Sequence, residues 1–388
     1  MGIDKLIRPE ELGIKLRQAR TLKRFTQEAA ATRLAIARTT LVAIEAGKRS
    51  VSSGELRAFA ELYDTPESEL LNRDEMPLEL SIQFRSGITN TLLDEEAIVA
   101  GMLNRLANSA LQIEALLNLP PPSVDLPAIV LSKSGSLEQQ AEDAALGLRS
   151  RLGIGQGPIQ NLAALMESEM GLRVFERPLP SKIGGAVAYD DKVGGFVLLN
   201  SKHPLFRRRV SAGHEVGHIL LRKPGVIVDL EDHEPEGREE RFCNLFAVAF
   251  LMPGAAVRRK AHELKDLFGT FSIRQLLMLA IFFSVSIEAA TRRMESLGLL
   301  SRGTYTRLKS QRIGNEHRRR VAEENLADEG PAFSPRTLMM AGVAYDRELL
   351  SEQQLASMLE LSLVEVRSAL EEQQHDRDAV GLALDLVE

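Results

Sequence analysis

The chain has 388 residues, a length that fits two or three domains. Its 54 acidic side chains outnumber its 48 basic ones, so a generally basic nucleic-acid-coating protein is excluded and any basic surface must be local. The single cysteine, Cys243, excludes an internal disulfide framework, and because no signal peptide and no apolar stretch of bilayer length is present, we expect a cytoplasmic protein with no membrane partner.

The first region with a clear pattern is residues 13–71, which predicts five short helices. They are expected at Gly13–Lys23, from a Thr26 cap to Leu34, at Arg38–Ala46, after Ser52 or Ser53, and after Pro66. The second and third helices, joined by a tight turn, form the arrangement that reads the major groove of DNA.

The residues of this arrangement are Phe25-Thr-Gln-Glu28 and Leu34-Ala-Ile-Ala-Arg-Thr-Thr-Leu-Val-Ala-Ile-Glu-Ala-Gly-Lys-Arg49. They resemble the lambda-repressor-like (XRE-type) helix-turn-helix family, and the resemblance implies a DNA-binding domain, placed at residues 8–72. Ala35 stands where the family usually has a turn glycine, so we expect a slightly altered turn. Arg20 and Glu45 resemble a structural ion pair of the family and are expected to support the fold.

The start of the second of these helices points at base edges, which makes its residues the candidate readers. They are Arg38, Thr39, Thr40 and Ala43. The candidate phosphate contacts are Arg17, Lys48 and Arg49, and the resemblance adds Gln27 at a phosphate or the first base. Double-stranded DNA is the expected partner, and a homodimer is expected because one half-site offers few base contacts. The alternative is a helical bundle whose basic face binds only a protein.

Residues 73–134 predict a helical linker, with a helix over Leu93–Leu117 and a stiff segment at Pro120-Pro-Pro122. A helix is expected to start at Ser136, where Gln139 would complete a capping box. Another helix is expected over Pro158–Met170.

Three short strands are predicted next, at Leu172–Phe175, Ala186–Tyr189 and Phe196–Leu199. The turn at Asp190-Asp-Lys-Val-Gly-Gly195 joins the last two into a hairpin. The edge of such a sheet can bind an extended peptide through main-chain hydrogen bonds, which favours a peptide substrate. A purely structural hairpin is the alternative.

The most definite chemical motif is His214-Glu-Val-Gly-His218, on a helix that stops at Lys223-Pro224-Gly225. Histidines four residues apart share one helix face, so both imidazoles can bind one zinc ion, and Glu215 can serve as general base. Gly213 and Gly217 weaken the helix, which predicts another backbone or a metal site close by. A buried helix with two hydrogen-bonded histidines is the alternative.

A catalytic zinc ion needs a third protein ligand and an open position. A second helix, Arg238–Met252, carries Glu240 and Asn244 one turn apart on one face. We take Glu240 as the third ligand and Asn244 as a hydrogen-bond partner of a ligand imidazole. Glu239 and Glu236 are the rival ligands.

Three motifs in this region resemble the ImmA/IrrE family of zinc metallopeptidases. They are Arg207-Arg-Arg-Val-Ser-Ala-Gly-His-Glu-Val-Gly-His218, Glu240-Arg-Phe-Cys-Asn-Leu-Phe-Ala247 and Leu251-Met-Pro253. The resemblance implies zinc on His214, His218 and Glu240, with Glu215 as general base, in a domain placed at residues 135–310. It also implies that the substrates are transcriptional repressors, often of the helix-turn-helix type. Val210-Ser211, Gly213 and Cys243 depart from the family pattern but leave the ligands intact.

The last part of the chain, residues 311–388, predicts a helical module. Before it, Ser284–Ser301 has an apolar stripe and resembles the tail of the same family. The basic run His317-Arg-Arg-Arg320 is interpreted as a solvated face, with contact to nucleic acid as the alternative. Residues 334–371 resemble a helix-turn-helix without basic residues on its second helix, which indicates a packing or partner module.

Together these patterns predict an α+β, mostly helical chain: a five-helix DNA-binding bundle, a zincin-like domain with a small sheet, and a helical C-terminal region. The expected function is a DNA-binding regulator with a zinc endopeptidase domain that cleaves a repressor or antitoxin under a stress or phage signal. A further oxyanion donor is expected from His233, Tyr189 or a nearby arginine. The alternative is a regulator or antitoxin of the XRE type whose zinc fold senses a signal or a partner and cleaves nothing.

Overall fold

The structure is a computed structural model and describes residues 7–22, 25–63, 65, 67–71, 90–120, 126–222, 225–230, 237–310 and 334–380. The chain divides into two compact units, Met1–Glu79 with Ile88–Gln112 and Leu80–Gly87 with Ile113–Glu388. The division falls within one long helix, α6 (Asn90–Leu116). The predicted fold class is confirmed, because the chain is mostly helical and contains a helix-turn-helix bundle and a small mixed sheet.

The first unit holds the five predicted helices around one apolar core. They are α1 (Pro9–Leu22), α2 (Gln27–Arg33), α3 (Arg38–Glu45), α4 (Ser53–Tyr63) and α5 (Glu67–Leu71). Thr26 caps α2 by accepting a hydrogen bond from the backbone N–H of Ala29, as predicted, and Ser52 caps α4. The prediction that α1 begins at Gly13 was wrong: it begins at Pro9, because proline fits the first turn of a helix. The predicted start at Pro66 lies outside the described residues.

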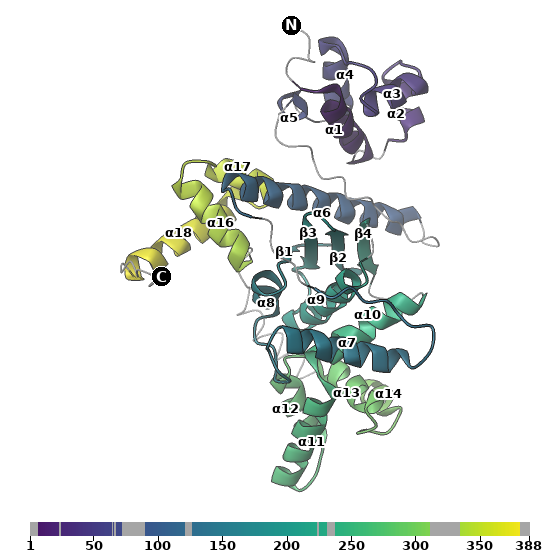
Figure 1. The fold of residues 1–388 in the computed structure, drawn as a ribbon, viewed down its shortest axis with the longest axis vertical. Helices are drawn as coiled ribbons and strands as arrows, with labels where there is room; N and C mark the ends of the chain where they lie inside the picture. Colours follow the sequence, from purple (N-terminus) through teal and green to yellow (C-terminus); the bar gives the residue numbers. More distant parts are fainter. Residues whose placement is uncertain are drawn as a thin grey trace. The chain divides into compact units, whose positions relative to one another are not determined.

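The second unit is built on a sheet in the order β1-β3-β2-β4 (Figure 1). The strands are β1 (Arg173–Arg177), β2 (Ile183–Asp190), β3 (Gly194–Asn200) and β4 (Gly225–Leu230). β2 and β3 form the predicted hairpin, and the Asp190 carboxylate accepts hydrogen bonds from two backbone N–H groups of its turn. The sequence reading missed β4, because Gly225 was taken only as part of a helix stop although Val226–Leu230 has a strand composition.

Helices stack on one face of this sheet. α9 (Leu205–Leu220) contacts β2 and β3, α10 (Gly237–Leu251) contacts α9, and α7 (Leu137–Arg151) contacts α10. Ser136 caps α7 as predicted, but the capping box was wrong, because the Gln139 amide donates to Asp143 instead. The helix expected from Pro158 is shorter: α8 (Leu162–Ser168) begins after Asn161, whose side chain caps it.

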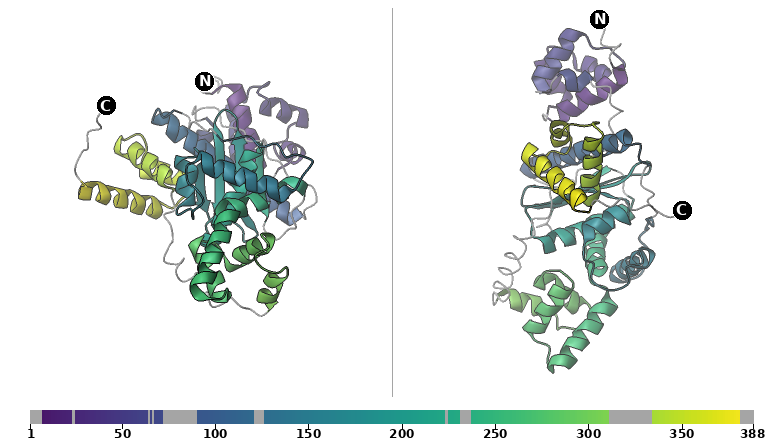
Figure 2. Two further views of the ribbon diagram at one scale, coloured as in Figure 1. Left: turned by 60° about the horizontal axis from the view of Figure 1, so that its bottom comes forward. Right: turned by 90° about the vertical axis from the view of Figure 1, so that its left-hand side faces the viewer.

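The remaining helices form two groups in the second unit (Figures 1 and 2). The first contains α11 (Gly254–Phe268), α12 (Ile273–Phe282), α13 (Ile287–Ser296) and α14 (Thr304–Ser310), and the second α16 (Pro335–Asp346), α17 (Glu352–Met358) and α18 (Leu363–Val380). The basic run at 317–320 lies outside the described residues. Within the described part of the chain no single helix is long and apolar enough to cross a membrane, whereas two bent pairs, α10 with α11 and α12 with α13, meet the length and composition criteria only when joined.

Among the described residues, one form of four-residue turn joins two helices three times: at 34–37 between α2 and α3, at 283–286 between α12 and α13, and at 359–362 between α17 and α18. Its second residue is left-handed without being glycine: Ala35 has φ 53°, Ser284 has φ 52° and Glu360 has φ 51°. In each turn the N–H of this residue bonds the carbonyl three residues back, and the next N–H bonds the carbonyl five residues back, as Ile36 bonds Ala31. The turn at Ala35 therefore has the same form as two turns elsewhere in this chain.

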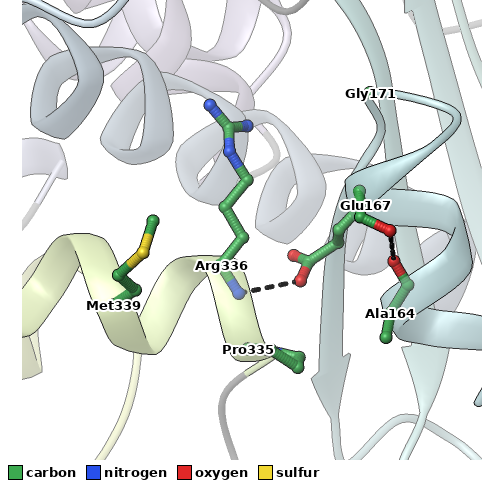
Figure 3. A pocket seen from close by; sticks show the side chains of 7 residues that line it. Ala164, Glu167, Gly171, Pro335, Arg336 and Met339 are labelled. Atoms are coloured by element: carbon green, nitrogen blue, oxygen red, sulfur yellow. Dashed lines mark hydrogen bonds between the residues drawn. The ribbon is translucent and has the colours of Figure 1, made fainter. Parts of the chain in front are cut away.

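The C-terminal helices are joined to the rest of the second unit by buried charged groups. Glu114, at the end of α6, is 3% exposed and pairs with Arg173 of β1 (2.6 Å) and Arg336 of α16 (2.9 Å). Beside this cluster a pocket of about 520 Å³ lies between α8 and α16 (Figure 3). Glu167 lines it and accepts a hydrogen bond from the backbone N–H of Arg336 (3.0 Å), and burial raises the pKa of that carboxyl. The ion pair between Glu114 and Arg336 and the hydrogen bond accepted by Glu167 together hold α16 in place.

We predict that Glu114→Ala lowers the free energy of unfolding by about 3–5 kcal/mol, because the buried guanidinium of Arg173 would lose its carboxylate. Urea unfolding followed by circular dichroism measures the loss. Glu352→Ala, which breaks the more exposed pair with Arg367, is the control and should leave the midpoint unchanged. A midpoint unchanged in Glu114→Ala as well would contradict the assigned role.

Candidate functional site

The site begins with two helices that touch through glycine. A Cβ added to Gly213 of α9 would lie 3.2 Å from Cα of Ala247, and one added to Gly217 would lie 3.1 Å from Cα of Cys243, both on α10. These distances are shorter than the ordinary contacts of a Cβ atom. The two helix backbones can therefore lie this close only because both positions are glycine. The predicted close neighbour of the two glycines is thus the backbone of α10, and buried Cys243 fills space against Gly217.

This contact brings three metal-ligating side chains together. One donor atom each from His214, His218 and Glu240 lies within 4.8 Å of the others. The two Nε2 atoms are 2.9 Å apart, and each is 3.5 Å from an oxygen of Glu240. Both histidines are buried, with 3% and 2% of their surface exposed. Among the described residues this is the one cluster of three or more such donors that could hold a metal ion.

The orientation of His214 leaves Nε2 for a ligand. Its Nδ1 donates to Oδ1 of Asn244 (3.0 Å), the partner that sequence reasoning proposed from the same helix as Glu240. That hydrogen bond places the proton on Nδ1, so the lone pair of Nε2 points at His218 and Glu240.

Burial and nearby charges together shift the pKa values of the two imidazoles in opposite directions. Burial alone would lower the pKa of His214, but Asp229, Glu240 and Glu215 outweigh it and raise this pKa to about 9. Burial lowers the pKa of His218; Glu240 opposes this effect and the charge on His214 adds to it. The carboxylates therefore favour the protonated form of His214, whereas burial disfavours the protonated form of His218.

The donor set fits a divalent metal ion better than a proton. In a tetrahedral site with bonds of about 2.0–2.2 Å, neighbouring donor atoms are about 3.3–3.6 Å apart. Nε2 of His214 lies 3.5 Å from Oε2 of Glu240 and Nε2 of His218 lies 3.5 Å from Oε1, and each distance taken alone falls in this range. The two Nε2 atoms face each other at 2.9 Å, so they would move apart by about 0.4 Å to bind one zinc ion with bonds of about 2.0–2.1 Å. Two imidazoles and one carboxylate are also a ligand set that zinc prefers.

Glu215 lies beside these donors on α9 and is completely buried. The neighbouring strand makes room for it, because a Cβ added to Gly185 of β2 would lie 2.9 Å from Oε1 of Glu215 and 2.8 Å from the carbonyl oxygen of Leu198. No side chain fits between strand and carboxylate, so Gly185 is the floor of the site. Sequence reasoning did not single out Gly185.

Of the other candidates that the structure describes, none is a member of the donor cluster. Glu239 is not one of its members, and Glu236 and His233 lie outside the described residues. The ring of Tyr189 lies 4.5 Å from the guanidinium of Arg222, and Arg208 pairs with Glu176 of β1. A residue that sequence reasoning missed is nearer: Oδ1 of Asp229, on β4, lies 3.7 Å from Nε2 of His214.

The second candidate surface is the exposed side of α3 in the first unit. Arg38 and Thr39 are exposed at its start, and Thr40 and Ala43 are half-buried. Val42 is 41% exposed on the same helix and was not among the predicted readers, although an exposed methyl group suits contact with thymine.

The side chains that support α3 also include one candidate DNA contact. Glu45 is buried and pairs with Arg20 (2.5 Å), the ion pair that the sequence suggested. The Gln27 amide donates to the same carboxylate (2.9 Å), so in this structure it supports α3. Arg49 pairs with Glu55 (2.7 Å), whereas Arg17 and Lys48 are exposed.

Two segments of the chain match models of known families. Residues 167–295 match a peptidase family, M78, described as the IrrE N-terminal-like domain, and residues 11–72 match a family described as a helix-turn-helix domain. No curated protein matches the chain. The predicted combination of a helix-turn-helix domain and an IrrE-like domain in one chain is therefore confirmed.

We predict that the chain binds one zinc ion and that affinity rises about tenfold per pH unit from pH 6.5 toward 9. The reason is that the proton on His214 competes with the metal, and raising the pH removes it. Competition with a coloured chelator at several pH values measures the slope. His214→Ala with His218→Ala should abolish binding; metal retained by this double variant would contradict the assignment.

Proposed function

We propose that the chain is a DNA-binding transcriptional regulator whose IrrE-like domain is a zinc-dependent endopeptidase. The proposed substrate is a repressor or antitoxin protein, and the proposed trigger is a stress or phage signal, both on the strength of the family resemblance. The helix-turn-helix domain would bring the peptidase to double-stranded DNA, as a homodimer, where such substrates are bound.

The observation that carries this proposal is the position of Glu215. A structural zinc site needs four ligands and no base. Here a buried carboxylate lies next to a set of three donors among the described residues, and Gly185 leaves the space that it occupies. A base beside an incomplete ligand set is what hydrolysis of a peptide bond requires.

The chain's own residues supply the remaining steps. A zinc ion held by the three donors would activate a water molecule and polarise the scissile carbonyl. Glu215 takes one proton from the attacking water and gives it to the amine when the carbon–nitrogen bond breaks. β4, the last strand of the described sheet, lies beside His214, so a substrate peptide paired with this strand would bring a carbonyl to the donors.

The second candidate is a regulator whose metal site serves as a sensor or partner-binding module without cleavage. One observation favours it: Asp229 approaches His214 from β4, and a protein carboxylate at the open position would close the site. The two candidates differ in whether Glu215 has a chemical role.

For the peptidase, we predict that Glu215→Gln keeps zinc and DNA affinity but slows cleavage by about 10²–10⁴-fold, because the amide cannot accept a proton. Wild type and variant are incubated with proteins encoded by adjacent genes, and new fragments are sought by mass spectrometry. Glu239→Gln, a neighbour of the third donor outside the cluster, is the matched control and should cleave normally. Equal cleavage by Glu215→Gln would contradict the role of Glu215 as general base, and absence of cleavage by the wild type would leave the sensor as the remaining candidate.

For the DNA-binding domain, we predict that Arg38→Ala relaxes sequence preference, because a bidentate contact to guanine contributes about 1–3 kcal/mol of discrimination. Lys48→Ala should weaken binding evenly across sequences and reduce the salt slope by about one. Selection from a randomised duplex library, followed by affinity measurements at several salt concentrations, separates the two effects. Absence of DNA binding by the wild type at low salt would contradict the assignment.

A further inference from the structure

Asp229 is the carboxylate of the site that neither the motif nor the ligand spacing explains. It lies on β4, its side chain is 14% exposed, and its Oδ1 is 3.7 Å from the ligand nitrogen of His214. It is not among the three residues of the donor cluster, which are His214, His218 and Glu240. It therefore approaches the cluster from the side of His214.

The strand register aims this side chain at the site. β2 and β4 are antiparallel, with Ile183 opposite Leu230 but Gly185 opposite Asp229, so β2 contains one extra residue at this point. Such a bulge re-aims neighbouring side chains and is common beside active sites. Ile227, two residues earlier on the same face of β4, packs against the core that contains α9. The side chain of Asp229 consequently faces α9.

Gly185 connects Asp229 with the proposed base. Residues opposite each other on antiparallel strands direct their side chains to the same face. The Cβ that Gly185 lacks would lie on the face used by Asp229 and 2.9 Å from Oε1 of Glu215. The two carboxylates thus approach one space from two sides, Glu215 from the helix and Asp229 from the edge of the sheet.

We propose that Asp229 is a positioning residue at this space: it accepts one hydrogen bond from the attacking water while Glu215 accepts the other. This inference rests on the proposed function. A water molecule has two O–H donors and two lone pairs. If both donors are held and a metal ion takes one lone pair, the other is left for the substrate carbonyl. Glu215 takes its proton as the oxygen–carbon bond forms and returns it to the leaving amine. Asp229 remains a carboxylate throughout and gains or loses no proton.

The test uses the full-length chain loaded with Co²⁺ and titrated with azide, an anion that takes the position of the attacking water. Azide binding is read from visible absorption. A carboxylate about 5 Å from a bound anion changes its affinity by at least tenfold, so Asp229→Asn should bind azide about tenfold more tightly than wild type. Zinc affinity should fall by no more than about a hundredfold, the range for a charged residue that lies beside the ligands without being one. With a cleavable substrate, the variant should lose kcat and keep KM.

Two further variants show whether an effect of Asp229→Asn on azide binding comes from loss of the Asp229 charge or from a change in folding. Asp191→Asn removes one carboxylate from the exposed turn between β2 and β3 and should match wild type in azide and zinc affinity. Asp229→Glu keeps the charge and should not bind azide more tightly. Thermal melting shows whether each variant is folded, and if Asp229→Asn is not, Asp229→Ala should give the same tightening.

Unchanged azide affinity in Asp229→Asn and Asp229→Ala would overturn the inference while leaving the peptidase proposal intact. A fall in zinc affinity of about a thousandfold or more would also overturn it, since Asp229 would then be a ligand, beyond the roughly 10–100-fold effect of a residue next to the ligands. Failure of the wild-type chain to bind cobalt or zinc would overturn the proposed function and this inference together.

Discussion

The close contact between α9 and α10 is the constraint on which the site depends. Gly213 and Gly217 let the two helix backbones approach within the width of one methyl group. Only at this separation can Glu240 on one helix reach the two histidines on the other. A larger residue at Gly213 or Gly217 would push apart the two helices that carry the donors. Close packing at these positions is therefore also a condition for metal binding.

The electrostatics of the site lead to the same conclusion. Two buried imidazoles lie among three carboxylates, those of Glu215, Asp229 and Glu240. Moving carboxylates out of water costs several kcal/mol for each ion unless a partner of opposite charge offsets it. In the metal-free chain a proton on His214 supplies one positive charge, and a divalent cation would supply two. Metal binding should thus be coupled to the stability of this part of the fold.

The sequence predicted those parts of the fold that depend on local patterns. Helix caps at Thr26 and Ser136, the hairpin around Asp190 and the histidine pair each follow from residues a few positions apart. It could not predict what depends on long-range contacts. β4 follows a helix stop that hid its start, and Asp229 lies 15 residues after His214 with no motif to connect the two.

The predicted turn at Ala35 illustrates a different limit. The missing glycine suggested an altered turn, yet Ala35 adopts the left-handed conformation that glycine usually provides. Its strain is offset by the pair of capping hydrogen bonds and by burial of the helices on both sides. Propensity alone cannot predict this, because the compensation comes from the packed core.

The three turns of this kind also show why the fold of a module does not decide its function. Behind the turn at Ala35, α3 opens with exposed Arg38 and Thr39, which can reach phosphates and base edges. Behind the turn at Glu360, α18 opens with Leu363 and Val364, 42% and 72% exposed, whose side chains can hydrogen-bond neither a phosphate nor a base. The backbone geometry is the same, and the side chains at the start of the second helix differ. On physical grounds, then, DNA recognition belongs to the N-terminal module, and the C-terminal one must be assigned from its own apolar surface.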